Sequence, residues 1–385
     1  MAGSERPSNV PPAAQVLTLR EPFRLRRGGT LAAVDIAYET WGELDASAGN
    51  AVLVLTGLSP SSHAASSSAD PKPGWWEDMI GPGKPIDTDR LFVVCVNSLG
   101  SCFGSTGPAS IDPATGNAYR LSFPVLSLED VASAAHAVVR HLGIERLLGV
   151  VGPSMGGMSA LAYCLQYPCE VEALVSISSA ARSLPFAIAL RSLQREMIRS
   201  DPEWHQGQYP LGDGPIRGMR LARKLGMITY RSAEEWRQRF GRERVADARS
   251  ETDGTNGAGP FGIEFEVESY LEAHARRFTG AFDANCYLYL SHAMDLFDAT
   301  DHGSNPECGS GRPDGLRHVL VVGAVTDFLF PIDQQRELAK MLEAPERNVT
   351  MVELPSLQGH DSFLVDMDRF RPPINDFFES LGGSR

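Results

Sequence analysis

A serine between glycines has the clearest chemical potential in this sequence. Ser154 lies in the motif Gly152-Pro153-Ser154-Met155-Gly156, which matches G-x-S-x-G and separates the apolar run 147–151 from a helical pattern at 156–167. Glycines allow the sharp strand-to-helix turn that lifts a serine hydroxyl clear of a sheet. Such a turn also aims the backbone N–H of Met155 at an oxygen that becomes negative during acyl transfer. The motif therefore predicts that Ser154 is a nucleophile, although a turn without chemistry can carry the same pattern.

A serine hydroxyl needs a base, and two later residues can supply and orient one. Asp327 follows the apolar run 318–322, and His360 follows the run 349–354. Both therefore come just after the C-terminal end of an expected strand, as Ser154 does, and parallel strands bring these ends to one edge of a sheet. The order Ser, Asp, His predicts His360 as the base and Asp327 as the acid that orients it. Each of these two, taken alone, is also typical of a surface loop.

A developing oxyanion needs a second N–H donor, usually from the loop after an early strand. Here that loop follows the run 51–56 and begins with Gly57 and Leu58. We expect the N–H of Leu58 to be the donor, with Gly57 allowing close approach. The same loop contains His63, an alternative base, although a histidine in a loop more often faces water.

The surrounding pattern supplies a scaffold for these residues. Short apolar runs alternate with segments whose apolar residues recur at helical spacing. The expected strands are 31–40, 51–56, 91–96, 147–151, 173–178, 318–322 and 349–354, and the helices between them include 126–142, 156–167, 333–342 and 366–381. Strands joined by crossover helices predict an α/β fold with a mainly parallel sheet and helices on both faces.

A helical insertion interrupts this alternation. Residues 182–296 contain five helical patterns and no convincing strand, so we expect a lid domain over the C-terminal edge of the sheet. The core domain then comprises residues 17–181 and 297–385, and the polar, Pro-rich residues 1–16 are expected to be a disordered leader. The segments 248–259 and 301–315 are rich in small polar residues and predict loops, whose role is open.

Composition excludes several classes of protein. The net charge of -13 argues against a nucleic-acid partner, because phosphate binding needs a basic face. No apolar run is long enough to cross a membrane, and the N-terminus lacks the features of a signal peptide. The six cysteines show no C-x-x-C pair, which predicts reduced thiols and a cytoplasmic location. The nine histidines show no ligand spacing, so no metal is expected.

From about residue 31 to the C-terminus, the chain resembles the homoserine O-acetyltransferase family of the α/β-hydrolase superfamily. The segments that carry the resemblance are 152–158, Leu-Thr-Gly at 55–57, 97–100 with 104–108, Leu-Ala-Arg-Lys-Leu-Gly-Met-Ile-Thr-Tyr-Arg at 221–231, and Gly-His-Asp-Ser-Phe at 359–363. The resemblance implies an α/β-hydrolase fold with a helical lid. It also implies a cytoplasmic homodimer joined through that lid, with acyl-CoA as a substrate and no bound cofactor.

The resemblance also implies a reaction. Family members move an acyl group from acyl-CoA to an amino-acid hydroxyl by a ping-pong mechanism through an acyl-serine. It implies that Arg223 binds the carboxylate of the amino acid and that Asp361 binds its ammonium group. A solvated helix charge is the alternative for Arg223, which stands beside other basic residues.

Departures from the family pattern bear on the substrates. The loop Gly57-Leu58-Ser59-Pro60 resembles the serine-acylating branch rather than the homoserine enzymes. Leu329 stands where homoserine succinyltransferases of the family tend to carry an arginine, which favours an acetyl group. Arg191 stands where many relatives carry a small polar residue and offers a cation for a succinyl carboxylate, although a surface lid charge is the alternative.

We therefore expect an enzyme that resembles the serine O-succinyltransferase branch and acts in cysteine biosynthesis. One alternative is a homoserine O-acetyl- or O-succinyltransferase in methionine biosynthesis. A serine esterase or thioesterase would use the same three residues but admit water to the acyl-enzyme. A binding module on a hydrolase scaffold would normally have lost one member of the triad, and all three are present.

Overall fold

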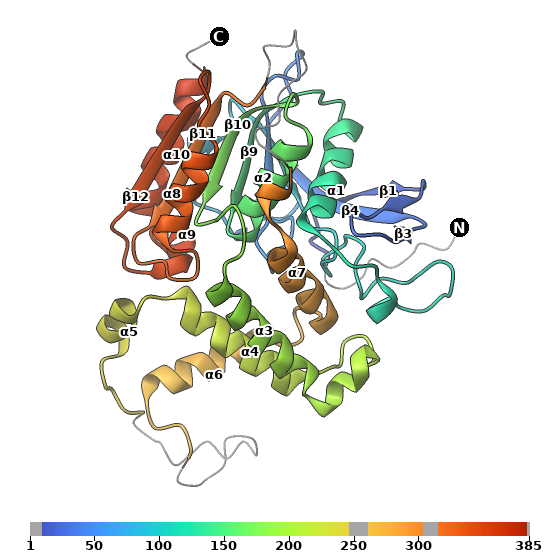
Figure 1. Cartoon of the computed structure of the whole chain (residues 1–385), viewed down its shortest axis with the longest axis vertical. Coiled ribbons are helices and arrows are strands. Elements are labelled where there is room, and N and C mark those ends of the chain that lie inside the picture. Colours follow the sequence, from blue (N-terminus) through green and yellow to red (C-terminus); the bar gives the residue numbers. More distant parts are fainter. Residues whose placement is uncertain (1–9, 246–260, 303–314, 383–385) are drawn as a thin grey trace.

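A mixed eight-stranded sheet forms the centre of the described structure (Figure 1). The computed structural model describes residues 10–245, 261–302 and 315–382. In spatial order the strands are β1 (Gln15–Leu19), β4 (Val34–Trp41), β8 (Phe92–Val96), β5 (Ala51–Leu55), β9 (Leu147–Pro153), β10 (Val171–Ile177), β11 (His318–Ala324) and β12 (Asn348–Leu354). The pairs β1/β4 and β4/β8 are antiparallel, and every later pair is parallel. The prediction of a mainly parallel α/β sheet is confirmed.

The sheet is covered on both faces, and its central strands show why. Along β5, Leu53 and Leu55 pack into one core while Val52 and Val54 pack into the other, and all four are buried. The first core includes side chains of α1 (Leu128–His141), α2 (Met155–Gln166) and α8 (Ile332–Met341), and the second includes side chains of α10 (Met367–Gly382). Strands buried on both faces appear as continuous apolar runs, which is how the sequence shows them.

Among the described residues, five α-helices lie between β10 and β11. They are α3 (Pro185–Arg199), α4 (Ile216–Tyr230), α5 (Ala233–Phe240), α6 (Glu266–Phe278) and α7 (Ala284–Leu296). Figure 1 shows α3 to α6 apart from the sheet, below it in this view, with α7 running back toward it. The smaller elements are β2 (Phe23–Arg24), β3 (Thr30–Leu31), β6 (Ile80–Gly81), β7 (Ile86–Asp87), the 3-10 turns Arg120–Ser122, Pro202–Gly207, Ala299–His302 and Gly359–Asp361, and α9 (Ser362–Val365).

The N-terminal boundary differs from the expectation. Strand β1 begins at Gln15, so the last two residues of the expected leader pair with β4 instead. The expected strand 31–40 is divided between β3 and β4. Residues 1–9, the predicted loop 248–259 and most of the predicted loop 301–315 lie outside the described residues.

The expectation of reduced thiols is wrong for one cysteine. Cys169 is disulfide-bonded, whereas Cys95, Cys102, Cys164 and Cys286 are free. Sequence spacing could not show this, because a disulfide requires proximity in space rather than along the chain. Within the described ranges, no helix has the length and apolarity to cross a bilayer.

We predict that Phe370→Ala destabilises the protein by about 3–5 kcal/mol, because Phe370 on α10 is fully buried against the sheet and its loss leaves a cavity. Urea unfolding followed by tryptophan fluorescence measures the change. Phe261→Ala is the matched control, since Phe261 is 98% exposed and its loss should cost less than about 0.5 kcal/mol. Equal unfolding midpoints for the two variants would contradict the assignment of this core.

Candidate active site

The backbone at Ser154 has a conformation that few non-glycine residues adopt. Ser154 is the N-cap of α2, with φ 55° and ψ −123°. A Cβ atom at Gly152 would lie 2.0 Å from the carbonyl oxygen of Gly156, and one at Gly156 would lie 2.1 Å from that of Leu55. The glycines are therefore required because β9, α2 and the end of β5 approach so closely.

Neighbouring strands hold this turn in place. The N–H of Ser154 donates to the carbonyl of Ile177 at 2.8 Å, and the hydroxyl of Ser179 donates to the carbonyl of Ser154 at 2.9 Å. Both partners belong to the end of β10 or follow it directly. The sheet therefore compensates for the strain of the turn, and the nucleophile is fixed by the strands beside it.

The three predicted catalytic side chains form a continuous hydrogen-bonded chain. Nε2 of His360 lies 2.8 Å from Oγ of Ser154, and Nδ1 of His360 lies 2.7 Å from Oδ2 of Asp327. Oδ1 of Asp327 accepts the N–H groups of Leu329 at 3.0 Å and Phe330 at 2.9 Å. The carboxylate is thus held on both oxygens, which directs the Nδ1 proton of the ring toward Asp327 and leaves Nε2 for the serine.

Aromatic rings fix the plane of the histidine. Phe330 stacks on His360 at 5.2 Å between ring centroids, and Phe363 meets the ring edge-on at 5.7 Å. Burial lowers the pKa of His360, but the carboxylate of Asp327 outweighs it and the net pKa is raised. The ring is therefore a stronger base than an isolated imidazole.

Two backbone amides are available for an oxyanion. Met155 begins α2, so its N–H has no acceptor within the helix. The N–H of Leu58 follows the end of β5 in the loop that lines the catalytic cavity. Neither amide has a hydrogen-bond partner among the described residues. Their joint role as the oxyanion hole stays a prediction.

A cavity of about 170 Å³ lies above the nucleophile. Its walls come from the loop after β5, from α3, α4 and α7 of the lid, and from the loops after β11 and β12. The predicted residues that line it are Gly57, Leu58, Ser59, Pro60, Ser154, Arg191, Arg223, Leu329, His360 and Asp361. The structure thus brings nearly all of the predicted site together, with Asp327 buried behind His360.

Arg223 offers an uncompensated positive charge in this cavity. Its guanidinium lies over the ring of Phe278 at 4.4 Å and near that of Tyr230 at 5.9 Å. Its Nε is buried without a partner, and no described carboxylate forms an ion pair with it. A buried N–H group without a partner is costly unless a ligand accepts its hydrogen bond, and the planar fork of a guanidinium suits a carboxylate.

Asp361 is present but already has one partner. Its Oδ2 lies 3.2 Å from Nε of Arg231, which also pairs with Glu235. Burial raises the pKa of Asp361, while Arg231, His360 and Arg223 act in the opposite direction. An ammonium group bound here would share the carboxylate with Arg231.

Arg191 is buried, so the alternative of an exposed lid charge is wrong. Its Nε lies 2.6 Å from Oδ1 of Asp295, and its Nη2 lies 2.6 Å from the hydroxyl of Ser183. Asp295 also pairs with Arg195 at 2.7 Å, so two arginines share one carboxylate and a net positive charge remains. Leu329 contributes an apolar surface to the same cavity.

Several residues that line the cavity were missed in the sequence. Gln194, Met294 and Tyr287 lie on the lid helices, and Trp75 lies in the long loop before β6. Helical periodicity showed that the lid helices have buried faces, but nothing in it showed that these faces meet the nucleophile. The alternative base, His63, does not line the cavity.

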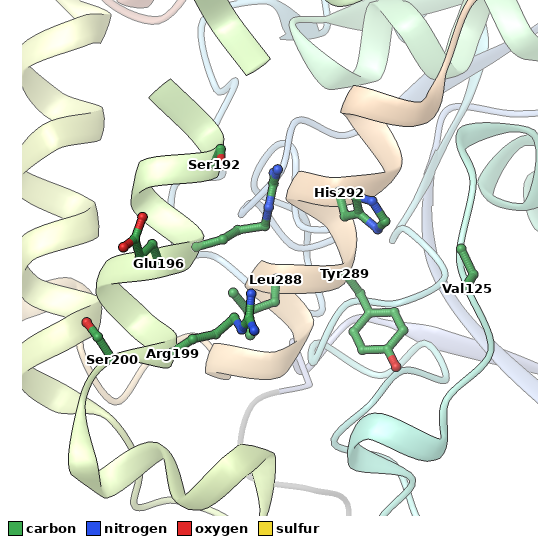
Figure 2. A pocket seen from close by; sticks show the side chains of 9 residues that line it. Val125, Ser192, Glu196, Arg199, Ser200, Leu288, Tyr289 and His292 are labelled. Atoms are coloured by element: carbon green, nitrogen blue, oxygen red, sulfur yellow. The ribbon is translucent and has the colours of Figure 1, made fainter. Parts of the chain in front are cut away.

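A larger hollow of about 730 Å³ lies beside α3 and α7 (Figure 2). It is lined by Val125, Ser192, Arg195, Glu196, Arg199, Ser200, Leu288, Tyr289 and His292. Both of its arginines arise from α3, and Arg195 is held by Asp295 and the Ser291 hydroxyl. Among its described residues no serine hydroxyl bonds to His292, so the nucleophilic chemistry belongs to the smaller cavity.

The fold and the serine–histidine–aspartate arrangement define a hydrolase-type scaffold with an activated nucleophile, and known proteins narrow this class. Residues 50–366 match the family model described as the alpha/beta hydrolase fold. The chain is 56% identical to the serine O-succinyltransferase of Litchfieldella anticariensis, over 96% of this chain and 99% of the relative. It is 57% identical to the L-serine/homoserine O-acetyltransferase of Streptomyces lavendulae, over 96% and 98%.

Solved structures agree with this placement. The homoserine O-acetyltransferase from Bacillus anthracis superposes with a TM-score of 0.84 at 27% identity, covering 94% of this chain and 96% of that one. Esterase E22 superposes with a TM-score of 0.81 at 28% identity, covering 94% and 99%. The chain belongs to the alpha/beta hydrolase fold family and, within it, to the group of O-acyltransferases that its curated relatives represent.

We predict that acylation of Ser154 falls as the pH drops through the raised pKa of His360, because the base acts in its neutral form. The midpoint for kcat/KM should lie above the ordinary imidazole pKa of 6.5. Asp327→Asn should lower the midpoint, since it removes the largest effects that raise this pKa while burial still lowers it, and should lower kcat by about 10³–10⁴-fold. Rates of thiol release across pH measure both effects, and an unshifted midpoint in the variant would contradict the assigned pair.

Proposed function

We propose that this protein transfers a succinyl group from succinyl-CoA to the hydroxyl of L-serine. The single observation that carries the proposal is the pair of arginines, Arg191 and Arg223, in the cavity around Ser154. One of them suits the carboxylate of the amino acid, and the other suits the carboxylate of the acyl group. Curated relatives named serine O-succinyltransferase, 52–56% identical to this chain, support the same choice.

The first half of the reaction acylates the enzyme. Oγ of Ser154 attacks the thioester carbonyl while Nε2 of His360 takes the hydroxyl proton. The N–H groups of Leu58 and Met155 stabilise the tetrahedral oxyanion. The carbon–sulfur bond then breaks, and the CoA thiolate leaves with the proton from His360. Acyl-CoA is a substrate here, and no bound cofactor is needed.

The second half transfers the acyl group. The hydroxyl of L-serine attacks the acyl-enzyme, and Nε2 of His360 takes its proton. Collapse of the second tetrahedral species returns that proton to Oγ of Ser154 and releases O-succinylserine. The carboxylate of the incoming amino acid binds Arg223, and its ammonium group binds Asp361.

A transferase must keep water from the acyl-enzyme, and the lid serves this purpose in the proposal. Leu190, Tyr230 and Tyr287 place apolar surface over the nucleophile from three lid helices. Water exclusion also strengthens the electrostatic interactions inside the cavity. The structural likeness to esterase E22 supports hydrolysis as an alternative reaction. An esterase on the same scaffold would need an open path for water to the acyl-enzyme.

Acetyl transfer is the second candidate because one observation favours it. Leu329 presents an apolar side chain where a second carboxylate would have to fit, and the relative from Streptomyces lavendulae is named for acetyl transfer to serine or homoserine. We favour succinyl because Arg191, which is buried in the cavity wall, shares the single carboxylate of Asp295 with Arg195, so a net positive charge remains there for an anionic ligand.

The proposed product also suggests a setting. An acylated serine hydroxyl is a good leaving group for replacement by sulfide, which supports a role in cysteine biosynthesis in the cytoplasm. The exposed apolar side chains Phe186, Leu193, Leu221 and Ile228 lie on the lid helices α3 and α4 and support a homodimer joined there.

We predict that Arg191→Gln lowers kcat/KM for succinyl-CoA by about 10–100-fold and leaves acetyl-CoA within about threefold, because it removes a charge-assisted bond to the succinyl carboxylate. Thiol release from each donor, with L-serine and with L-homoserine as acceptors, measures the ratio. Arg195→Gln is the control, since Arg195 shares Asp295 but does not line the cavity. If the unmodified enzyme released thiol faster from acetyl-CoA than from succinyl-CoA, the transferred group would be acetyl and not succinyl.

We predict that Arg223→Lys raises the KM for L-serine by about 10–100-fold, because an ammonium group cannot reproduce the planar fork. The rate of thiol release from succinyl-CoA in a single turnover without serine should stay unchanged. Arg217→Lys provides the comparison, since Arg217 is exposed on the same helix. A normal KM in Arg223→Lys would mean that the amino acid binds elsewhere.

A further inference from the structure

A histidine–carboxylate pair, in which the carboxylate is buried and the histidine partly exposed, lies at the end of the loop that carries Leu58. Nδ1 of His63 is 2.9 Å from Oε2 of Glu39, and the Ser62 hydroxyl donates to Oε1 of Glu39 at 3.3 Å. Glu39 is on β4 and only 2% exposed. In the sheet, β8 and β5 lie between β4 and β9, the strand that leads to Ser154. We name residues 57–63 the oxyanion loop.

His63 also ties the loop to the segment beyond it. Its Nε2 lies 2.8 Å from the carbonyl oxygen of Lys72, and its own carbonyl accepts the N–H of Trp75 at 3.2 Å. The indole N–H of Trp75 donates to the carbonyl of Ser61 at 3.1 Å. Trp75 lines the catalytic cavity, as does the start of the oxyanion loop. The contacts of His63 therefore help to position both of these parts of the cavity wall.

Further contacts hold the oxyanion loop on both sides of the short stretch 57–59. At its start, the hydroxyls of Thr56 and Ser98 are 3.1 Å apart. In the middle, the side-chain amide of Asn97 donates to the carbonyl of Pro60 at 3.4 Å. At the end, Glu39 holds Ser62 and His63. The stretch 57–59 between these contacts contains the proposed oxyanion donor, so its position depends on the anchors.

The contacts of His63 favour its charged form. A backbone carbonyl can only accept, so Nε2 carries a proton, and a second proton at Nδ1 makes the bond to Glu39 an ion pair. Burial lowers the pKa of His63, but Glu39, the Lys72 carbonyl and Asp70 outweigh it and raise the net pKa. Both ring nitrogens are occupied and the side chain is outside the cavity wall, so His63 is not a base in the reaction.

We propose that Glu39 and His63 are positioning residues for the oxyanion hole. The pair fixes the end of the oxyanion loop against β4, so that the N–H of Leu58 already points at the reacting oxygen before the substrate arrives. The inference rests on acylation of Ser154 and on Leu58 as a donor. It does not depend on which acyl group or amino acid the enzyme uses.

The test follows acylation by p-nitrophenyl acetate, which reports the attack of Ser154 without acyl-CoA or an amino acid. Glu39→Gln and His63→Asn should each lower the first-order acylation rate constant about 10-fold. This is less than the loss of about 10²–10³-fold that removal of an oxyanion donor causes, since the donor is displaced and not deleted. The dissociation constant of the ester should stay within about twofold. The double variant should lose no more than either single variant, because the two act as one unit.

Glu129→Gln is the matched control. Glu129 forms another buried carboxylate–histidine contact, with Oε1 3.1 Å from Nε2 of His302, and it does not line the catalytic cavity. It should lower the thermal midpoint as Glu39→Gln does and leave the acylation rate constant unchanged. If Glu39 had a purely structural role, Glu39→Gln and Glu129→Gln would change the thermal midpoint and the acylation rate constant in the same way.

Either variant of the pair that folds and is acylated at the unmodified rate overturns the proposal, as does a loss that appears only in ester binding. His63→Asn, at a partly exposed position, tests the proposal if Glu39→Gln does not fold. A protein that is acylated by the ester but not by succinyl-CoA would contradict the proposed function while leaving this inference intact.

Discussion

The close approach of backbone at Ser154 is the constraint on which the rest of the structure depends. Strand β9 turns into α2 within one residue, and the turn presses against the end of β5 on one side and against β10 on the other. Glycines make the approach sterically possible, and hydrogen bonds from both ends of the turn stabilise the positive φ of the serine. Once this turn is fixed at the edge of a parallel sheet, the loops after β11 and β12 bring Asp327 and His360 to the same edge, because parallel strands end together there.

Charge distribution explains why a hydrolase-type nucleophile can serve a transferase. The cavity is small and has the lid helices α3, α4 and α7 as part of its wall, yet it contains one guanidinium without an ion pair and a second one that shares its carboxylate with Arg195. Such charges are unfavourable in an empty, dry cavity and favourable when anionic ligands fill it. In the proposed reaction, the binding of two carboxylate-bearing substrates offsets the cost of burying these groups, and neutral water gains nothing comparable.

Particular residues show how far the sequence could be interpreted. The triad was predictable because each member follows a strand that appears in the sequence as a short apolar run, although only β9 and β11 are buried and β12 at the sheet edge is mostly not. The start of β1 within the expected leader was not predictable. This edge strand, Gln15–Leu19, has five residues whose side chains are exposed or partly exposed, so its sequence resembles a polar tail. The Asp295 partner of Arg191 lies 104 residues away, and the Glu39 partner of His63 lies 24 residues away across the sheet. Contacts of this kind depend on tertiary packing, and they cannot be predicted from residue spacing in a single sequence.

Covalent capture of the acyl group on Ser154 tests the central claim most directly. The protein is mixed with succinyl-CoA without an amino acid, quenched in acid, digested and analysed by mass spectrometry, with Ser154→Ala treated alongside. The account predicts a succinyl adduct on the peptide that contains Ser154, absent from the variant and discharged when L-serine is added before the quench. Formation of O-succinylserine at the normal rate without any adduct on Ser154, or with an adduct on another residue, would contradict it.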